Sequence, residues 1–215
     1  FDECIGYPAT YEYCKNSVER TLRWAKRGKD VFNNPNQSLF GIVQGGEYED
    51  LRKHCVEELV KMDFDGYSIG GTSVGEDKKT QYKMVRYATS YLPKDKVRYL
   101  MGVGDPIDIV ENVCNGIDIF DCVSPTRLAR HGHALTRFGK INIKNAKYKE
   151  DFTPIEDACT CYACQNYTKA YIKHLINCEE TFGARLLSIH NIHYLINLTE
   201  ELRQAIKEDR LLEYR

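Results

Sequence analysis

A single carboxylate at the end of a short predicted strand is the first group in this sequence that could do chemistry. Residues 116–130 read GIDIFDCVSPTRLAR. Residues 117–121 alternate as a strand does, and the strand ends on Asp121 before a Ser-Pro pair breaks it. Arg127 and Arg130 follow, and residues 122–149 contain seven Lys or Arg and two His but no Asp or Glu. This pattern suits an acid that reaches a sugar while its neighbours hold phosphates. The alternative is a loop-capping aspartate followed by solvated basic residues.

Three cysteines within six residues are candidate metal ligands. Cys159, Cys161 and Cys164 form a C-x-C-x-x-C motif. Core cysteines have no reason to cluster, whereas adjacent thiolates form a soft ligand set that suits zinc. The candidates for the fourth ligand are His174, Cys178, His190 and His193. A closed Cys₃His set has no open position, so we expect one structural Zn²⁺ per chain that stabilises a small appended unit.

Alternating strands and helices must position these groups. Strands are predicted over residues 39–43, 65–69, 97–103 and 117–121, with residues 1–4 as the end of an earlier strand. Helices are predicted over 16–28, 47–62 and 78–91, from Pro106 onward, and over 199–212; one more begins near Cys164 and carries His174 and Cys178. The first of these helices is predicted from a capping box formed by Asn16 and Glu19. Such alternation predicts a parallel sheet with right-handed crossovers.

Polar and glycine residues gather at the C-terminal ends of these strands. They are Asp2, Gln44, Gly70, Gly71, Gly102 and Asp121. In a (β/α)₈ barrel this rim carries the active site, and in a doubly wound sheet it is also the ligand edge. The position therefore predicts a ligand site without separating the two folds. The glycines are either plain turn residues or positions where a flat ligand lies against the backbone.

Composition narrows the function classes. The 215 residues are 42% apolar and 28% charged, with a net charge of −1. We identify neither an apolar run of membrane-spanning length nor a signal peptide, and we expect no membrane association. Nine scattered cysteines favour a reducing compartment, the cytoplasm, over a disulfide framework. The first residue is Phe1, and we expect the chain to be the later part of a longer protein.

Five motifs occur together along the whole chain. They are FGIVQGG, GYSIGG followed by VGE, YLMGVG, FDCVSPTRLAR, and C-x-C-x-x-C with a histidine 26 residues after its last cysteine. Together they resemble the bacterial-type tRNA-guanine transglycosylase (queuine tRNA-ribosyltransferase) family. The resemblance implies a (β/α)₈ TIM barrel with an inserted zinc-binding subdomain. Residues 1–150 would supply about the last five strands and the basic RNA-facing stretch, and residues 151–215 the zinc subdomain and C-terminal helices.

The resemblance also implies an activity and roles for individual residues. The family exchanges the wobble guanine of tRNAs with a U-G-U anticodon for a 7-deazaguanine, in queuosine biosynthesis. Asp121 would be the nucleophile, and the family's general-base aspartate would lie in the absent strands, so we expect the isolated fragment to be inactive. The implied base-binding residues are Asp2, Cys4, Gln44, Gly70, Gly71, Thr72, Glu76 and Met101. The implied tRNA contacts are Thr126, Arg127 and Arg130, and the implied zinc ligands are Cys159, Cys161, Cys164 and His190.

Val74 and Thr72 bear on which base is used. Val74 is bulky where eukaryotic relatives have glycine, which favours the 7-aminomethyl base preQ1 over queuine. Thr72 departs from the leucine usual in the family, whose carbonyl holds the aminomethyl group. The expected partners are the tRNA anticodon loop, the free base and a second copy of the chain. The alternatives are a non-catalytic tRNA-binding partner subunit, disfavoured because Asp121, Gln44 and both arginines are present, and a bare zinc-bound RNA-binding module.

Overall fold

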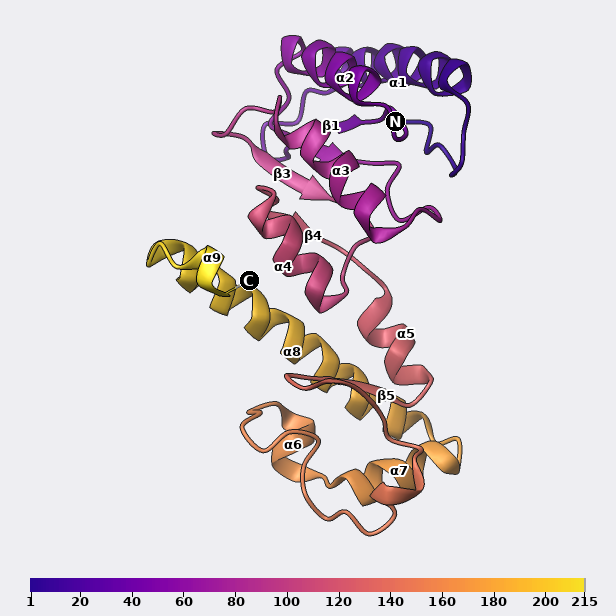
Figure 1. Cartoon of the computed structure of the whole chain (residues 1–215), viewed down its shortest axis with the longest axis vertical. Coiled ribbons are helices and arrows are strands. Elements are labelled where there is room, and N and C mark those ends of the chain that lie inside the picture. The colour runs from indigo at the N-terminus through magenta and orange to yellow at the C-terminus, as the bar shows by residue number, and fades with distance from the viewer. Residues whose placement is uncertain (215) are drawn as a thin grey trace. The chain divides into compact units, whose positions relative to one another are not determined.

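Residues 1–214 are described by a computed structural model in which the chain divides into two compact units (Figure 1). The first unit comprises residues 1–103 and 107–121, and the second comprises residues 104–106 and 122–214. The basic residues 122–149 thus belong to the same unit as the cysteines of residues 159–164, whereas the sequence predicted a division after residue 150. Among the described helices, none has the length and apolar character needed to cross a membrane.

The first unit is a parallel sheet with helical crossovers. Its elements are α1 (Tyr11–Val31), β1 (Phe40–Val43), α2 (Glu49–Lys61), β2 (Gly66–Ile69), α3 (Lys78–Thr89), β3 (Val97–Leu100), α4 (Pro106–Cys114) and β4 (Ile119–Phe120). The strands pair in the order β1-β2-β3-β4, and every pair is parallel. The apolar faces of α1, α2 and α3 share one core with the sheet, in which Val18, Leu59 and Val85 are buried together with Ile69 and Leu100. The predicted α/β alternation is confirmed.

Two predicted features at the start of this unit are wrong. Helix α1 begins at Tyr11, because the Thr10 side chain accepts the Tyr13 N–H at 3.4 Å and caps the helix there. Asn16 lies inside the helix and caps nothing. Residues 1–4 form no strand, and the Glu3 N–H donates to Thr21 Oγ1 at 3.1 Å instead of to a neighbouring strand. The described sheet therefore has four strands.

The strand before Asp121 is shorter than predicted. Ile117 lies in the connection between α4 and the strand, and its N–H donates to the Asn112 carbonyl of α4 at 3.0 Å. Pairing with β3 is limited to Ile119 and Phe120. Asp121 still follows the last paired residue directly, so its position at the strand end is unchanged.

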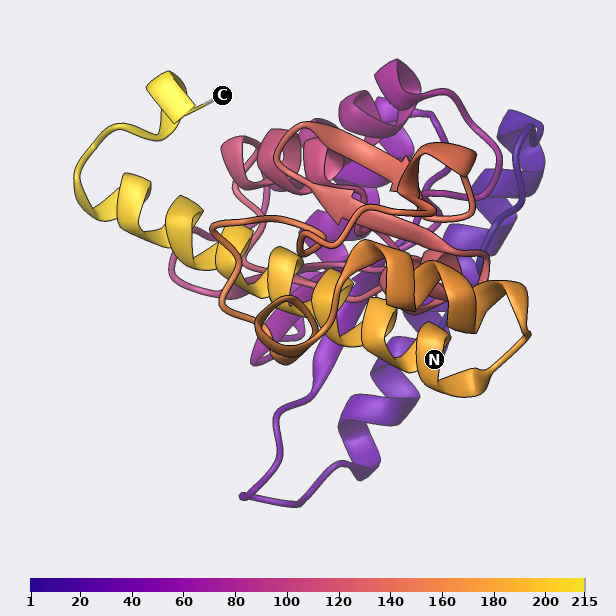
Figure 2. The ribbon, with the colours of Figure 1, turned by 90° about the horizontal axis from the view of Figure 1, so that it is seen from below.

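The second unit is organised around one long helix. Its elements are α5 (Ser124–Arg130), the antiparallel hairpin β5 (His133–Thr136) and β6 (Gly139–Asn142), the 3₁₀ turn η1 (Ala146–Tyr148), α6 (Tyr162–Asn166), α7 (Lys169–Asn177), α8 (Thr181–Lys207) and α9 (Leu211–Tyr214). Helix α8 packs against α5, α6, α7 and β5. Figure 2 shows α7 and α8 side by side, joined by a tight connection. The core consists of Ala134, Ile143, Ile172 and Leu186 together with the three clustered cysteines.

Two predictions for this unit are corrected, and one element was not predicted. The last helix was predicted over residues 199–212, but α8 already begins at Thr181 and ends at Lys207. The helix expected to run from Cys164 through Cys178 is two helices, because Thr168 caps a new one by accepting the Tyr171 N–H at 3.3 Å. The hairpin β5–β6 was not predicted.

Candidate functional site

The first group of site residues follows the strands of the parallel sheet. Gln44 comes directly after β1, Gly70 after β2 and Asp121 after β4, and Gly102 lies two residues after β3. Because the carboxyl ends of parallel strands meet at one edge, these residues share that edge. The predicted placement at strand ends is confirmed for these four residues.

Two donors hold one oxygen of the Asp121 carboxylate. Its Oδ1 accepts the Tyr99 hydroxyl at 2.7 Å and the Gly102 N–H at 2.9 Å. Both bonds go to Oδ1, so among the described residues Oδ2 is the oxygen left for another partner, and Asp121 is exposed. Burial raises the pKa of Tyr99 to about 12, with the hydrogen bond to Asp121 adding to the shift, so the phenol remains a donor at neutral pH.

Sequence reasoning missed Tyr99, and strand register could have indicated it. Tyr99 is paired with Ile119 in the β3–β4 register, and Asp121 lies two residues further along. Residues two apart on a strand project to the same face, so the phenol and the carboxylate are diagonal neighbours.

Asp2 and Gln44 form a second polar pair. Gln44 Nε2 donates to Asp2 Oδ2 at 2.6 Å. Gln44 is 0% exposed, and within residues 1–214 its Oε1 has no hydrogen-bond partner. A buried acceptor left unpaired is costly, and such atoms mark places where a ligand can supply the missing donor. The Thr72 hydroxyl, also buried, lacks a partner in the same part of the chain.

The Gly70–Gly71 pair lies against the Gln44 amide. A Cβ on Gly70 would lie 2.5 Å from Gln44 Nε2, and one on Gly71 would lie 2.4 Å from Oε1. Gly71 also has φ of +62°, in the left-handed region. Space favours glycine at both positions, and the conformation favours it at Gly71.

Arg52 lies beneath this glycine pair and was missed by sequence reasoning. It is 0% exposed, and its guanidinium donates to the carbonyls of Gly46 at 2.7 Å and of Gly70 and Gly71 at 3.3 Å. The available signal was its position next to Leu51 on the buried face of α2.

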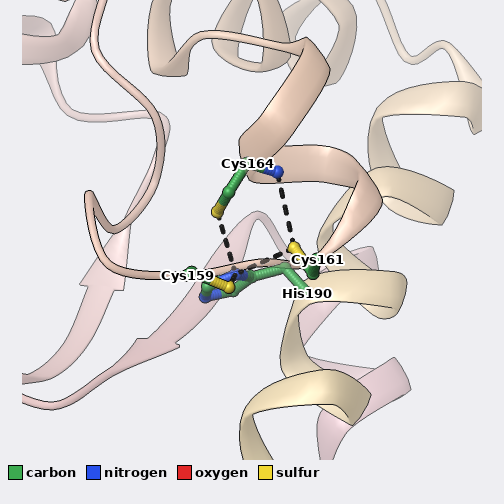
Figure 3. A group of neighbouring side chains, drawn as sticks. All are labelled: Cys159, Cys161, Cys164 and His190. Carbon is green, nitrogen blue, oxygen red and sulfur yellow. Dashed lines mark hydrogen bonds between the residues drawn. The ribbon is translucent and has the colours of Figure 1, made fainter.

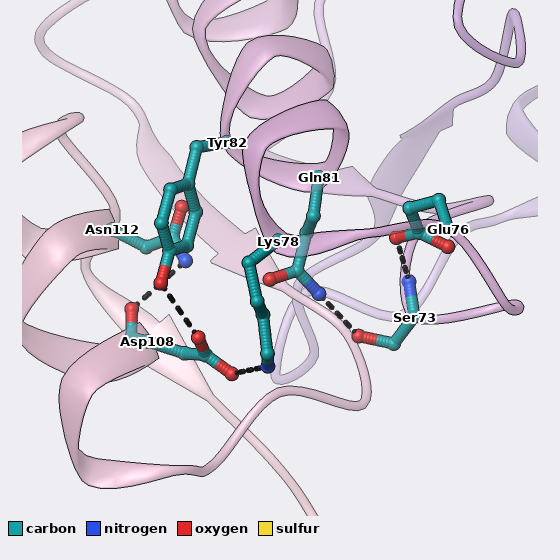
Figure 4. Close-up of polar contacts among 7 residues, drawn as sticks. All are labelled: Ser73, Glu76, Lys78, Gln81, Tyr82, Asp108 and Asn112. Carbon is teal, nitrogen blue, oxygen red and sulfur yellow. Dashed lines mark hydrogen bonds and ion pairs between the residues drawn. The ribbon is translucent and has the colours of Figure 1, made fainter.

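The loop after Gly71 is held by side chains of its own segment and of α3 (Figure 4). The Glu76 carboxylate accepts the N–H groups of Ser73 at 2.5 Å and Val74 at 2.9 Å. Gln81 Nε2 donates to Ser73 Oγ at 2.6 Å. Val74 lines a cavity of about 10 Å³, roughly the space of one water, together with Gly71.

A buried carboxylate on α4 reinforces α3. Asp108 is 3% exposed and accepts hydrogen bonds from Lys78 and from the Tyr82 hydroxyl, the latter at 2.7 Å (Figure 4). Lys78 is the first residue of α3. The helix that anchors the loop is therefore tied to its neighbour by a paired buried charge.

The remaining residues that were predicted to contact the base or the tRNA lie in both units. In the first unit Cys4 is exposed and Met101 is half-buried. Thr126, Arg127 and Arg130 lie on α5 in the second unit, where both arginines are exposed and the Thr126 hydroxyl donates to the Val123 carbonyl at 3.2 Å.

The second unit contains a metal-ligand cluster (Figure 3). One ligand atom from each of Cys159, Cys161, Cys164 and His190 lies within 4.8 Å of all the others, and all four residues are buried. His190 Nδ1 lies 3.6, 3.6 and 3.3 Å from the three sulfur atoms in that order. Hydrogen bonding from Cys164 lowers the pKa of the Cys161 thiol well below its ordinary value, which favours the thiolate that binds a metal.

The surroundings of His190 fix its role. Its Nε2 lies 2.7 Å from the Leu135 carbonyl oxygen, which can only accept a hydrogen bond, so Nε2 carries the proton. The lone pair of the neutral ring is then on Nδ1, which faces the sulfurs. His193 instead contacts the Thr160 hydroxyl and the Asn197 amide, and the other two candidates lie together on the exposed end of α7. Three sulfurs and one imidazole in a closed, buried set fit one structural zinc ion.

Fold and site thus define an α/β protein with ligand groups at the ends of parallel strands and a Cys₃His structural zinc site. Residues 1–215 match the family model described as queuine tRNA-ribosyltransferase. The chain is 56% identical over 216 residues to proteins named queuine tRNA-ribosyltransferase from Staphylococcus aureus strains JH9, Mu50 and USA300. It belongs to the queuine tRNA-ribosyltransferase family. The matches cover 100% of this chain and 57% of each relative, so it spans little more than half their length.

Proposed function

We propose that the chain is part of a tRNA-guanine transglycosylase, a pentosyltransferase that exchanges the wobble guanine of U-G-U anticodon tRNAs for preQ1 in queuosine biosynthesis. The observation that carries the proposal is Asp121, a strand-end carboxylate with one oxygen held by Tyr99 and Gly102. A fixed carboxylate with one oxygen available is suited to attack a sugar carbon, as in retaining glycosidases.

The reaction has two displacements at the ribose C1′. In the first, Asp121 Oδ2 donates an electron pair to C1′, and the bond from C1′ to N9 of guanine breaks. Guanine leaves with the bonding pair and takes up a proton, while the tRNA remains attached through an ester. In the second, N9 of the incoming base loses its proton, attacks C1′ and expels the carboxylate. Tyr99 and Gly102 keep Oδ1 in place through both steps.

Base recognition is assigned to the edge of the parallel sheet where the strands end, near Gln44. Asp2 offers a carboxylate to the N–H donors of guanine, and Gln44 and the Gly71 N–H are donors for its carbonyl oxygen. Met101 forms one wall, and Gly70 lets the base approach the backbone. Breaking the internal bond would free the Gln44 Nε2 donor and the Asp2 carboxylate for the base, and an N–H of the base would supply the donor that the buried Gln44 Oε1 lacks within residues 1–214.

Selection of the base is assigned to the loop that begins at Thr72. Glu76 fixes the peptides of Ser73 and Val74, and Val74 is bulky where eukaryotic relatives that take queuine have glycine. Cys4 matches the bacterial pattern. These residues support preQ1 as the incoming base.

The tRNA is assigned to the second unit. Arg127 and Arg130 are exposed on α5, where guanidinium groups can pair with phosphates and with the neighbouring uridine, and Thr126 lies beside them. The lysines and arginines of residues 122–149 extend this positive surface. A substrate of this kind places the protein in the cytoplasm.

Two broader features belong to the same proposal. The strands pair in chain order without the reversal of a doubly wound sheet, which supports a segment of a closed (β/α)₈ barrel.

Self-association as a homodimer is assigned to the zinc-bearing unit, where Tyr162 and Tyr171 are 54% and 43% exposed around Tyr167. Sedimentation of the full-length protein at increasing concentration tests the dimer.

The test of catalysis is Asp121→Asn in the full-length protein. The substitution keeps the shape of the side chain but removes the charge that attacks C1′, so we expect no denaturant-stable complex with tRNA and no radiolabelled guanine exchange. Asp118→Asn is the matched control, because Asp118 is an exposed carboxylate of the same segment that bonds the Arg98 N–H. An Asp121→Asn protein that still forms the complex would refute the assignment. A wild-type protein that binds tRNA without exchange would favour the partner-subunit alternative.

A further inference from the structure

The buried guanidinium of Arg52 has no role in the proposed function so far. It is 0% exposed, and among residues 1–214 no carboxylate lies within ion-pair distance of it. Burial lowers the pKa of Arg52 to about 10, which still leaves the side chain charged at neutral pH. A buried charge that serves packing alone is usually replaceable by an apolar side chain without loss of stability. The retained charge therefore points to a task for which charge is needed.

The acceptors of Arg52 identify that task. Its Nη1 and Nη2 both donate to the Gly70 carbonyl at 3.3 Å, and Nη2 also donates to the Gly71 carbonyl at 3.3 Å. The Gly70 carbonyl and the Gly71 N–H belong to the same peptide group, whose planarity fixes the direction of one from the other. A cation on the carbonyl side also withdraws electron density from the amide, so the N–H becomes a stronger donor.

We propose that Arg52 is a positioning residue that orients and polarises the Gly70–Gly71 peptide so that the Gly71 N–H binds the carbonyl oxygen of a purine base. The inference rests on the proposed function and deepens its base-binding step. The Arg52 Nε–H donates to the Gly46 carbonyl at 2.7 Å, so the same side chain also fixes the loop that follows Gln44. One buried cation thus holds the two strand-end loops that face the base.

The test compares two bases that differ in the carbonyl oxygen and in the N1 proton that accompanies it. Guanine has this oxygen, and 2-aminopurine, which is fluorescent, lacks it. In full-length Arg52→Lys, the planar fork is replaced by a single ammonium group, and we expect the Kd for guanine to rise about five- to tenfold, the cost of weakening one hydrogen bond. The Kd for 2-aminopurine should change less than about twofold, because it cannot accept the bond from Gly71.

Arg98 provides a matched control within the same unit. It is 8% exposed and donates to the carbonyls of Leu92 and Pro93, on loops at the opposite end of β3. Arg98→Lys makes the same chemical change at a similar depth, so it should alter the Kd of neither base. Equal weakening of both bases by Arg52→Lys, or no weakening of either, would overturn the inference.

A second measurement keeps the inference separate from folding and from the proposed function. In the ligand-free protein, loss of the cation from the Gly70 carbonyl should shift the Gly71 amide nitrogen resonance upfield in Arg52→Lys but not in Arg98→Lys. An unchanged resonance contradicts the polarisation. If the resonance shifts but wild-type protein exchanges no guanine, the proposed function fails while the action of Arg52 on this peptide stands.

Discussion

Asn191 is the residue whose loss we expect to damage the zinc-bearing unit most directly. It is 0% exposed on α8, and its Oδ1 accepts the Leu135 N–H at 2.8 Å while its Nδ2 donates to the carbonyls of Pro125 and His133, both at 3.0 Å. Asn191→Ala removes three hydrogen bonds and leaves three main-chain groups without their partner. At about 1 kcal/mol for each bond, the free energy of unfolding of this unit should fall by about 3 kcal/mol.

The assay follows zinc release during a urea titration, with a weak chromogenic chelator as the reporter. With a slope of about 1.5 kcal/mol per molar urea, the loss lowers the midpoint by about 2 M. Asn197→Ala is the control, because Asn197 lies on the same helix but is exposed, and within residues 1–214 its side chain hydrogen-bonds only the His193 ring, through the amide nitrogen. Its effect should stay within about 0.5 kcal/mol. Equal urea midpoints for the two variants would refute the claim that the three hydrogen bonds of Asn191 stabilise this unit.

Three further perturbations test other parts of the structure. Tyr99→Phe removes one donor from Asp121, so guanine exchange should slow by about tenfold. Burial raises the pKa of Tyr99 to about 12, so its contribution to the free energy of unfolding should persist to about pH 10 and be lost as the pH rises through about 12. Ultraviolet difference titration against the variant measures the pKa of this phenol. Cys161→Ala should release zinc, by metal analysis, and expose the segment after Thr153 to protease while the parallel sheet stays protected. RNA binding by residues 122–149 should weaken steeply with salt, and a flat salt dependence would argue against phosphate contacts.

Local sequence patterns were sufficient to predict the parallel sheet and the metal cluster. The alternation of helical and strand periods fixes crossovers, and crossovers bring strand ends such as Gln44 and Asp121 to one edge. Clustered thiols restrict the metal site to a few ligand sets, although His190 was selected over His193 only by family resemblance and then by its geometry. These features depend on spacing within a segment, which a sequence displays directly.

Other features depend on contacts that spacing does not display. Arg52 lies among apolar residues on α2, and only the fold brings its guanidinium to glycines 18 and 19 residues away. The bond from Tyr99 to Asp121 requires the β3–β4 register. The hairpin was not predicted, because residues 122–149 were interpreted from their charge alone, as a stretch that binds anions. Residues 1–4 were assigned to a strand end from their sequence, but the Glu3 N–H donates to the Thr21 side chain of α1.

Leu135 connects the metal to the basic hairpin. Its carbonyl accepts from His190 and its N–H donates to Asn191, so two consecutive residues of α8 hold both main-chain groups of one residue of β5. Ordering of the hairpin and retention of the metal are therefore thermodynamically linked. By reciprocity, any ligand that binds the ordered hairpin more tightly when zinc is present must increase the affinity for zinc by the same factor. A polyanion bound to the hairpin's basic side chains would then slow the loss of an ion that it never touches.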